Sequence, residues 1–341
     1  MKHLFPPSAD SAKSTLNQRI LEIFRDRERG IVSGEEISRA LHISRTAVWK
    51  HIKSLRALGY GVVAVPSRGY RLISVPDLLV PDEISSGISV ERIGGRIISL
   101  RETESTNVVA FKLAEEGAEE GTVVVAEAQT HGKGRMGRRW ESPAGTNLYC
   151  SIILRPPIVP MQAAQLTLCS VVAVARTIEK VTSLLPSIKW PNDVLINGKK
   201  VAGLLNEMSA ETEKVNFVIL GIGININMTA DQFPSDLRHP ATSLLLESGK
   251  RLNRSEIVCN LLESLDEVYS LFLSKGYEPI RDEWLSRSNV LNRRVSVSCR
   301  DTNVAGLVTG IDEYGALLLQ RDDGQVEKIM AGDVTILQAK G

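Results

Sequence analysis

A glycine-rich basic loop at residues 132–140 (GKGRMGRRW) has the composition of an anion-binding segment. Glycines let a backbone approach a ligand closely, and cationic side chains can clamp a phosphate or a carboxylate. The cations among the glycines are Lys133, Arg135, Arg138 and Arg139. Gly132, Gly134 and Gly137 also fit GxGxxG, but a dinucleotide-binding fold needs a helix directly afterwards, and here a turn and then a strand follow. The loop therefore favours a phosphate clamp, with a solvated basic loop as the alternative.

A second polar segment, KWPND at residues 189–193, follows a short apolar run. The ammonium group of Lys189 suits a phosphoryl group, because a fixed positive charge stabilises the negative charge that builds in the transition state. Asn192 and Asp193 add polar ligands. The following Asn-Gly pair predicts a hairpin turn into the strand KKVAGLLNE. This segment is the second candidate for phosphate chemistry.

A third polar segment, Glu104-Ser-Thr-Asn107, lies where a predicted strand meets a predicted helix. A serine at such a junction is typical of a helix N-cap, since its side-chain oxygen can accept a hydrogen bond from an amide of the first turn. Farther along, a strand with alternating polarity ends in GIGININ. Asn225 and Asn227 are two residues apart, so they can face the same pocket.

These candidates need a mixed α/β body to hold them, and the hydrophobic pattern between Glu91 and about Trp284 predicts one. Strands are predicted at Ile97–Arg101, Thr122–Ala128, Leu148–Leu154 and Val215–Asn227. A nearly all-apolar helix from about Ala163 to Val181 should be buried. The core stripe of a second long helix consists of Ile257, Leu261, Leu265, Val268 and Phe272.

Charge separates the first quarter of the chain from the rest. Residues 1–75 carry a net charge of +7 and the remainder carries −6, as expected if only the first quarter touches nucleic acid. Apolar spacing predicts a first helix from Leu16 to Phe24. A capping box at Ser33–Glu36 predicts the start of a second helix, and Ser44 caps a third after a turn at His42-Ile43.

Two helices separated by so short a turn are typical of a helix-turn-helix, whose second helix enters the major groove of DNA. The predicted DNA-binding region is Gly34 to Lys53. Its main candidates are Ser44, Arg45, Thr46, Trp49, Lys50, His51 and Lys53. A hairpin around Pro66–Gly69 adds a wing with Arg68 and Arg71. The alternative is a three-helix packing domain that does not bind DNA.

Composition limits the remaining possibilities. The chain has 341 residues, and its four cysteines lie far apart without a CxxC pair, which argues against a disulfide scaffold and against a zinc cluster. No secretory signal is evident, and the best apolar run is only about half the length of a membrane span. We expect a cytoplasmic protein that does not use a membrane. From Arg294 onward, five short runs separated by turns predict a small barrel.

The motifs ESTN, Q-THGKGRMGRRW, KWPND, KKVAG and GIGININ occur here in the order and spacing of the biotin–protein ligases, and the chain resembles that family over essentially its full length. With its basic N-terminal module, it is similar to the bifunctional biotin–[acetyl-CoA-carboxylase] ligases that also repress the biotin operon. One departure is Lys133, where the family loop usually has an arginine. The charge is kept, but bidentate geometry is lost.

The resemblance implies a multidomain α+β fold. A winged helix-turn-helix domain would occupy residues 1–75 and a central mixed α/β biotin/lipoyl-ligase-like catalytic domain residues 76–288. Residues 289–341 would form an SH3-like small β-barrel. Residues 76–81 read as the linker after the first domain.

The resemblance also implies roles for individual residues. Ser105, Thr106 and Gln129 would hold the polar ring of biotin. Lys133, Gly134 and Arg135 would cover its valerate and the phosphate, and Lys189 would lie at the carboxylate and the α-phosphate. Lys189 and Arg135 are the expected catalytic residues. The remaining expected binding residues are Asn107, Gly132 and Gly203; no metal-ligating residue is predicted.

Two reaction steps follow from the resemblance. Biotin and ATP, with Mg²⁺ on the phosphates, would give biotinyl-5′-AMP and pyrophosphate. A lysine of the biotin carboxyl carrier protein of acetyl-CoA carboxylase would then attack the mixed anhydride. No general base for that amine is evident in the sequence.

The resemblance also implies biotin operator DNA as a second partner, bound by a homodimer that biotinyl-5′-AMP promotes. The sequence itself supports only the need of the glycine-rich loop for an anion, since its four cations are expected to lack partners until one arrives. A transcription factor that only senses a ligand is a competing interpretation, against which the phosphate clamp argues. A ligase for lipoate is another, against which KWPND argues. A protein kinase is excluded, because the sequence has no HRD, DFG or VAIK motif.

Overall fold

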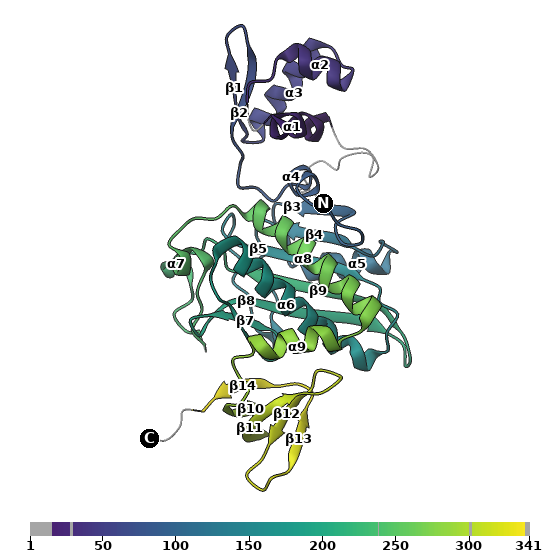
Figure 1. Cartoon of the computed structure of the whole chain (residues 1–341), viewed down its shortest axis with the longest axis vertical. Helices are drawn as coiled ribbons and strands as arrows, with labels where there is room; N and C mark the ends of the chain where they lie inside the picture. The colour runs from purple at the N-terminus through teal and green to yellow at the C-terminus, as the bar shows by residue number, and fades with distance from the viewer. Residues whose placement is uncertain (1–15, 28–29, 238, 300–301, 338–341) are drawn as a thin grey trace.

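The structure is a computed structural model that describes residues 16–27, 30–237, 239–299 and 302–337. Three units follow one another along the long axis of the molecule: a small helical unit, a large sheet with helices, and a small β unit (Figure 1). The first 15 residues of the expected DNA-binding domain lie outside the described residues, as does part of the turn after Ser298.

The N-terminal unit is a helix-turn-helix followed by a hairpin, as the sequence predicts. Its elements are α1 (Leu16–Asp26), α2 (Gly34–Leu41), α3 (Arg45–Ala57), β1 (Gly61–Val65) and β2 (Gly69–Ser74). His42 ends α2 in the left-handed region at φ 55°, and Ser44 caps α3 by accepting a 3.1 Å hydrogen bond from the amide of Ala47. Apolar side chains of all three helices and the hairpin form one core.

The predicted capping box requires two hydrogen bonds, and the prediction is wrong for one of them. The hydroxyl of Ser33 accepts a 3.0 Å hydrogen bond from the amide of Glu36, as expected. The carboxylate of Glu36 instead pairs with Arg27 at 2.7 Å. A hydrogen bond between two charged groups is stronger than one to a neutral amide, which accounts for the difference.

Polar contacts fasten the N-terminal unit and the linker after it to the rest of the chain. Arg25 of α1 pairs at 2.6 Å with Glu83 in α4 (Pro81–Ser86). In the linker, Asp77 lies 3.1 Å from the guanidinium of Arg254, which also pairs with Glu127 at 2.8 Å. Because the Arg254 side chain is only 1% exposed, both carboxylates are needed to compensate its buried charge.

Among the described residues, seven strands form the central sheet in the order β3-β4-β5-β9-β8-β7-β6. They are β3 (Arg96–Leu100), β4 (Thr122–Ala126), β5 (Leu148–Leu154), β6 (Ser187–Lys189), β7 (Asp193–Ile196), β8 (Lys199–Ala210) and β9 (Val215–Ile224). Neighbours are antiparallel except β3 and β4. The five strands predicted from sequence, KKVAGLLNE among them, are therefore confirmed, although β9 ends at Ile224 and not at Asn227.

Helices cover both faces of this sheet. On one face α6 (Ala163–Thr182) and α8 (Arg254–Lys275) pack together, with α9 (Glu278–Arg287) beside them (Figure 1). On the other face α5 (Thr106–Glu115) packs in a separate apolar cluster. Adjacent residues of β4 belong to different clusters, Val123 to the first and Val124 to the second, because side chains of a strand alternate between faces. The short α7 (Leu244–Ser248) lies beyond β9.

The expected buried helix is α6. By length and composition, the segment Pro160–Thr182 could cross a membrane, but 67% of its most apolar window is buried inside the protein. Packing against the sheet and α8 accounts for the apolar composition, as for the core helix of any layered α/β body.

Strand β8 is paired along most of its length on one edge but only over its first residues on the other. It pairs with β9 from Ala202 to Ala210, but β7 reaches only as far as Gly203. From about Leu205 onward, no strand of the described part of the chain pairs with the other edge of β8.

The C-terminal unit is an antiparallel sheet of five described strands, as the turn pattern predicts. They are β10 (Arg294–Ser298), β11 (Asn303–Ile311), β12 (Leu317–Gln320), β13 (Val326–Ile329) and β14 (Asp333–Ile336). The indole N–H of Trp190 donates a 3.0 Å hydrogen bond to the carbonyl of Gly315, and Gln165 of α6 donates one to Glu313. These bonds dock the unit beside the KWPND segment.

Candidate active site

A cavity of about 550 Å³ lies where the polar motifs converge. It is lined from the start of α5, the glycine-rich loop, the KWPND segment, strands β8 and β9, a segment at 233–241 and the start of β14. Of the predicted site residues, those that line it are Ser105, Thr106, Asn107, Gln129, Lys133, Gly134, Arg135, Lys189 and Gly203. Gly132 does not; its carbonyl instead accepts a 2.8 Å hydrogen bond from the amide of Trp140 behind the cavity wall.

One end of the cavity is polar and uncharged. The amide and hydroxyl of Thr106 donate to Oε1 of Gln129 at 2.8 and 3.2 Å, and Nε2 of Gln129 donates to Ser142. The hydroxyl of Ser151 lies 2.6 Å from Oδ1 of Asn107, and Thr106 and Asn107 are 4% exposed. This network fixes donors and acceptors in place, which is what a neutral polar ring requires.

Ser105 holds the N-cap position of α5, as predicted, but its side chain makes no capping hydrogen bond. Gln129 instead accepts from the next residue's amide, at Thr106. Ser105 thus lines the cavity without its hydroxyl capping the helix, although the residue is only 2% exposed.

Trp140 forms a wall of the cavity through two close approaches. A Cβ at Gly223 would lie 2.6 Å from the indole ring of Trp140, and a Cβ at Gly203 would lie 3.0 Å from the same ring. Both positions therefore need glycine. The indole N–H of Trp140 is buried without a hydrogen-bond partner among the described residues, so it is available as a donor.

The expectation that the loop cations lack partners is wrong. Lys133 lies 3.7 Å from Glu207, Arg135 donates a 3.1 Å hydrogen bond to Asn192, and Arg138 pairs with Asp333 at 2.8 Å. Arg139 pairs with Glu141 at 3.3 Å. The sequence could not show these partners, because three of the four come from distant segments. Burial lowers the pKa of Arg135 below its ordinary value.

The KWPND segment contributes to the cavity through both ends. Lys189 ends β6 and stands opposite Asp193 of β7 in the strand pairing. Asn192, 8% exposed, donates a 2.6 Å hydrogen bond to the carbonyl of Leu204 and accepts from Arg135. A buried amide thus joins the KWPND segment to the glycine-rich loop, which the sequence alone does not reveal.

Sequence reasoning missed Lys200. Its ammonium group lies 2.6 Å from Asp193 and 5.4 Å from the centre of the Trp140 ring, inside the cavity. The KKVAG motif did not reveal it, because a β-bulge at Val201 breaks the alternation of β8: Lys200 lies beside Gly203, whereas Val201 and Ala202 both belong to the core cluster. Without the fold, nothing distinguished the two lysines.

A covering segment, described at residues 233–237 and 239–241, was also missed. Its lining residues are Phe233, Pro234, Asp236, Leu237, His239 and Ala241. Backbone hydrogen bonds attach its end to Lys200, whose amide donates to Pro240 and whose carbonyl accepts from Thr242, at 2.8 and 2.9 Å. No short motif marks such a segment.

The two asparagines of GIGININ do not share a pocket. Asn225 lines the cavity and donates a 3.0 Å hydrogen bond to the carbonyl of Thr242. Asn227 donates to the carbonyl of Leu252 and accepts from its amide, away from the cavity. Strand β9 ends at Ile224, so the alternation expected for both residues no longer applies.

Charge in the cavity favours an anionic ligand. Among the described residues, six cationic side chains line it: Lys133, Arg135, Arg138, Arg139, Lys189 and Lys200. Four acidic side chains of the described residues line it: Glu141, Asp193, Asp236 and Asp333. A polar, uncharged end next to an end with excess positive charge suits one elongated ligand that carries phosphate. The described residues contain no group of three or more His, Cys, Asp or Glu side chains able to hold a metal ion.

The main predicted DNA-binding positions of α3 are exposed, except His51, which is half-buried. The exposed positions are Ser44, Arg45, Thr46, Trp49, Lys50 and Lys53, and the wing residues Arg68 and Arg71 are exposed as well. Trp49 is 53% exposed, with the ammonium of Lys53 5.6 Å from its ring centre, so it does not belong to the core. The His51 ring lies 2.9 Å from Oδ1 of Asn17, which ties α3 to α1.

Comparisons with known proteins follow the three units. The family described as "Biotin/lipoate A/B protein ligase family" matches residues 99–225, "HTH domain" matches 17–71, and "Biotin protein ligase C terminal domain" matches 290–337. The bifunctional ligase/repressor BirA of Bacillus subtilis (strain 168) is 41% identical over 324 residues, which are 95% of this chain and 99% of that protein. This chain belongs to the family of bifunctional biotin protein ligase/repressors.

More distant family members agree with this assignment. The bifunctional ligase/repressor BirA of Escherichia coli (strain K12) is 32% identical over 90% of this chain and 94% of its own length. Among solved structures, the biotin protein ligase from Aquifex aeolicus in complex with biotin and ATP superposes with a TM-score of 0.62 at 30% identity, over 72% of this chain and 99% of that one. The chain is therefore a biotin protein ligase joined to a helix-turn-helix repressor unit.

Proposed function

We propose that the ligase binds biotin and ATP in the 550 Å³ cavity, forms biotinyl-5′-AMP, and passes the biotinyl group to a lysine of a biotin carboxyl carrier protein. The observation that carries this proposal is the division of the cavity into an uncharged polar end and a cationic end. Biotin has a neutral ureido ring and a carboxylate, and ATP supplies the phosphates. One elongated adenylate matches both ends.

Ser105, Thr106 and Gln129 hold the ureido ring in this proposal, and Asn107 supports them through its 2.7 Å hydrogen bond to Glu207. Gly134 and Gly203 have no side chain, which leaves room for the bound ligand, and Trp140 forms a wall of the cavity. Biotin bound in this way would direct its carboxylate toward the cationic end.

In the first step, an oxygen of the biotin carboxylate attacks the α-phosphorus of ATP and pyrophosphate leaves. Lys189 and Arg135 neutralise the charge that builds on the phosphoryl oxygens, and the structure adds Lys200 as a third cation. Lys133 replaces the usual arginine; its 3.7 Å contact with Glu207 supports a role as a point charge on the loop. Positioning and charge neutralisation are sufficient for this chemistry.

Mg²⁺ enters with the nucleotide in this proposal. It is commonly held by one or two carboxylates together with substrate phosphates, so a preformed cluster of acidic residues is not required. Asp193 is a carboxylate of the cavity that fits this role, next to Lys200.

The N-terminal unit binds biotin operator DNA in this proposal, with α3 in the major groove and Arg68 and Arg71 of the wing on the backbone. The exposed basic face of α3 supports it, since phosphate contacts from Lys and Arg supply much of the affinity of such modules.

The same proposal includes a homodimer that biotinyl-5′-AMP promotes. A sheet edge without a strand partner can pair with a second copy of itself, and β8 has such an edge from about Leu205 onward. Glu207 of this edge contacts both Asn107 and Lys133 of the cavity, so a ligand that draws Lys133 to its phosphate changes the edge. A dimer then places two recognition helices on one palindromic operator.

We also propose that the domain boundaries lie between residues 75 and 76 and between residues 288 and 289, and that the protein is cytoplasmic. The hairpin ends at Ser74 and β10 begins at Arg294, which supports the limits. The four cysteines are free, which supports a reducing compartment.

The function is tested by mixing the purified chain with biotin, ATP and Mg²⁺ and measuring pyrophosphate release. We expect release that depends on biotin and is absent with lipoate. Biotin-independent release would contradict the proposal.

For the dimer, sedimentation and a DNA-binding titration at fixed salt should show a larger dimer fraction and tighter operator binding with biotinyl-AMP than with biotin alone. Equal dimerisation in both conditions would remove the coupling, but not the ligase.

A further inference from the structure

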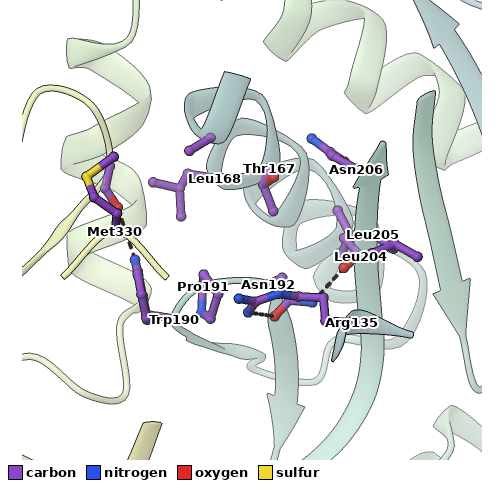
Figure 2. A pocket seen from close by; sticks show the side chains of 12 residues that line it. Arg135, Thr167, Leu168, Trp190, Pro191, Asn192, Leu204, Leu205, Asn206 and Met330 are labelled. Carbon is purple, nitrogen blue, oxygen red and sulfur yellow. Dashed lines mark hydrogen bonds between the residues drawn. The ribbon is translucent and has the colours of Figure 1, made fainter. Parts of the chain in front are cut away.

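A second cavity of about 150 Å³ lies at the free edge of β8 (Figure 2). Its walls come from α6, β8, the KWPND segment and two positions of the C-terminal unit, Gly315 and Met330. Six of its lining residues also line the larger cavity: Arg135, Trp190, Pro191, Asn192, Leu204 and Leu205. The guanidinium of Arg135 therefore borders both cavities, and the smaller one is a second approach to the same centre, from the edge of the sheet.

The walls of this smaller cavity are mostly apolar, with one unsatisfied amide. Leu168, Leu204 and Met330 contribute hydrocarbon, and none of the described residues that line it is acidic. Both polar atoms of the Asn206 side chain are buried without a hydrogen-bond partner among the described residues. A buried amide without partners costs free energy, so Asn206 gains when a ligand group donates to it.

We propose that this smaller cavity receives the side chain of the acceptor lysine in the second step of the reaction, an inference that rests on the proposed ligase function. A cavity of about 150 Å³ holds a molecule the size of benzene. Four methylenes and an amine fit that volume, whereas a nucleotide or biotin does not. The methylenes lie along Leu168 and Leu204, and Oδ1 of Asn206 accepts from the amine.

The chemistry of the step explains why such walls are useful. The neutral lysine nitrogen attacks the carbonyl carbon of the biotinyl adenylate and forms an amide bond. The bond from that carbon to the phosphate oxygen breaks, AMP leaves with its electron pair, and the nitrogen loses one proton to water. Only the uncharged amine can attack.

Two features of the cavity favour the uncharged amine. Apolar walls disfavour the ammonium form, and so does the neighbouring positive charge of Arg135, so together they lower the pKa of the incoming lysine. A general base within the cavity is then unnecessary, in agreement with the absence of acidic lining residues. The apolar walls and the charge of Arg135 thus favour the neutral amine, for which the sequence offered no general base.

The test separates the two half-reactions. Ala164→Leu fills the cavity from α6, and Asn206→Leu removes the amide at similar size; neither residue has a part in adenylation. The matched control is Ala163→Leu, the same substitution one position earlier, which is similarly half-buried but does not line the cavity. Pyrophosphate release from biotin and ATP reports the first step. Single-turnover transfer from enzyme-bound biotinyl-AMP to a biotin carboxyl carrier protein domain reports the second.

We expect transfer to fall about tenfold or more in both cavity variants, because the nucleophile is misplaced. Pyrophosphate release should stay within about twofold of wild type, as should both steps in Ala163→Leu. Reaction of the bound adenylate with hydroxylamine, a nucleophile without a carbon chain, should be unchanged in all three variants. A general folding defect would instead lower both steps together.

Wild-type transfer in both Ala164→Leu and Asn206→Leu would overturn the assignment. A loss confined to pyrophosphate release would also overturn it, since the cavity would then serve the leaving group of the first step. If the wild-type chain releases no pyrophosphate at all, the proposed ligase function itself fails, which is a different result from failure of the transfer measurement alone.

Discussion

The catalytic cavity and the recognition helix are both rich in cations, but they hold those cations differently. In the cavity, Lys133, Arg138 and Lys200 each have a carboxylate partner within the protein. On α3, Lys50 and Lys53 face solvent. A phosphate that enters the cavity must join or replace existing ion pairs, so the cavity selects a ligand whose shape brings its phosphate to these side chains. DNA phosphates contact solvated lysines and release counterions, so the face of α3 attracts any polyanion. Net charge therefore located the DNA-binding unit and could not locate the cavity.

The largest expected effect removes one region entirely. Deletion of residues 1–75 should abolish specific operator binding, since the exposed face of α3 and the wing are lost. Adenylation should persist at least in part, because every cavity residue lies beyond position 100. The full chain is the control in a DNA-binding titration and a pyrophosphate assay run side by side. Specific operator binding by the truncated protein would show that the two regions are not separable in this way.

The next effect concerns a single cation of the cavity. Lys189→Ala should lower the adenylation rate on the order of 10²–10³-fold, the usual cost of removing one electrostatic stabiliser of a transition state. Lys180→Ala, an exposed lysine of α6 paired with Glu263, is the control and should leave the rate unchanged. Operator binding by the protein loaded with biotinyl-AMP should survive in both variants. A near-wild-type rate in Lys189→Ala would remove the role assigned to it.

A smaller effect should appear for one cation of the wing. Arg68→Ala should weaken operator binding by a similar factor for all sequences and reduce the slope of log affinity against log salt by about 1. Pyrophosphate release should not change. Lys112→Ala, an exposed lysine of α5 on the catalytic unit, should leave the slope as it is. An unaltered slope in Arg68→Ala would place the wing away from DNA.

The smallest effect tests how the cavity cover is held. Burial of Glu247 opposes its ionisation, but hydrogen bonds from Thr242, Asn197 and Lys199 outweigh burial and hold its pKa below the ordinary value. The ionised form then stabilises the fold above about pH 4.3, and this contribution is lost as pH falls through the lowered pKa. Glu247→Gln should therefore lower the free energy of unfolding at pH 7.

The deficit of Glu247→Gln relative to wild type should shrink as the solution is acidified below the ordinary glutamate pKa. Denaturant unfolding of both proteins at several pH values measures it. A deficit that stays constant with pH would mean that the charge of Glu247 does not stabilise the covering segment.

How far the sequence predicts this molecule depends on the range over which its signals act. The helix-turn-helix was predictable because caps and apolar spacing act within a few residues, as at Ser44. The strands and α6 were predictable from periodicity. The partners of the loop cations were not, because Glu207 and Asp333 reach Lys133 and Arg138 only through the folded sheet and the docked C-terminal unit.

The candidate site shows the same limit. Most motif residues line the cavity, because a motif is a short stretch whose residues share one location. Lys200 was missed since two adjacent lysines differ only by the face of the strand they occupy. The covering segment was missed because it presents mixed side chains without a recognisable spacing, and its position depends on backbone bonds to Lys200.

The ion pairs of the buried Arg254 guanidinium limit where the DNA-binding unit can be lost from the ligase during evolution. The catalytic body depends on one residue of the linker, Asp77, to help neutralise that charge, and on nothing before it in this network. A lineage could lose the helix-turn-helix in a single genetic event and keep this network, provided that the break fell before Asp77, although Glu83 of α4 would then lose its partner Arg25. A break a few residues later would leave a buried positive charge short of its counterion. Selection would then have to replace the arginine as well.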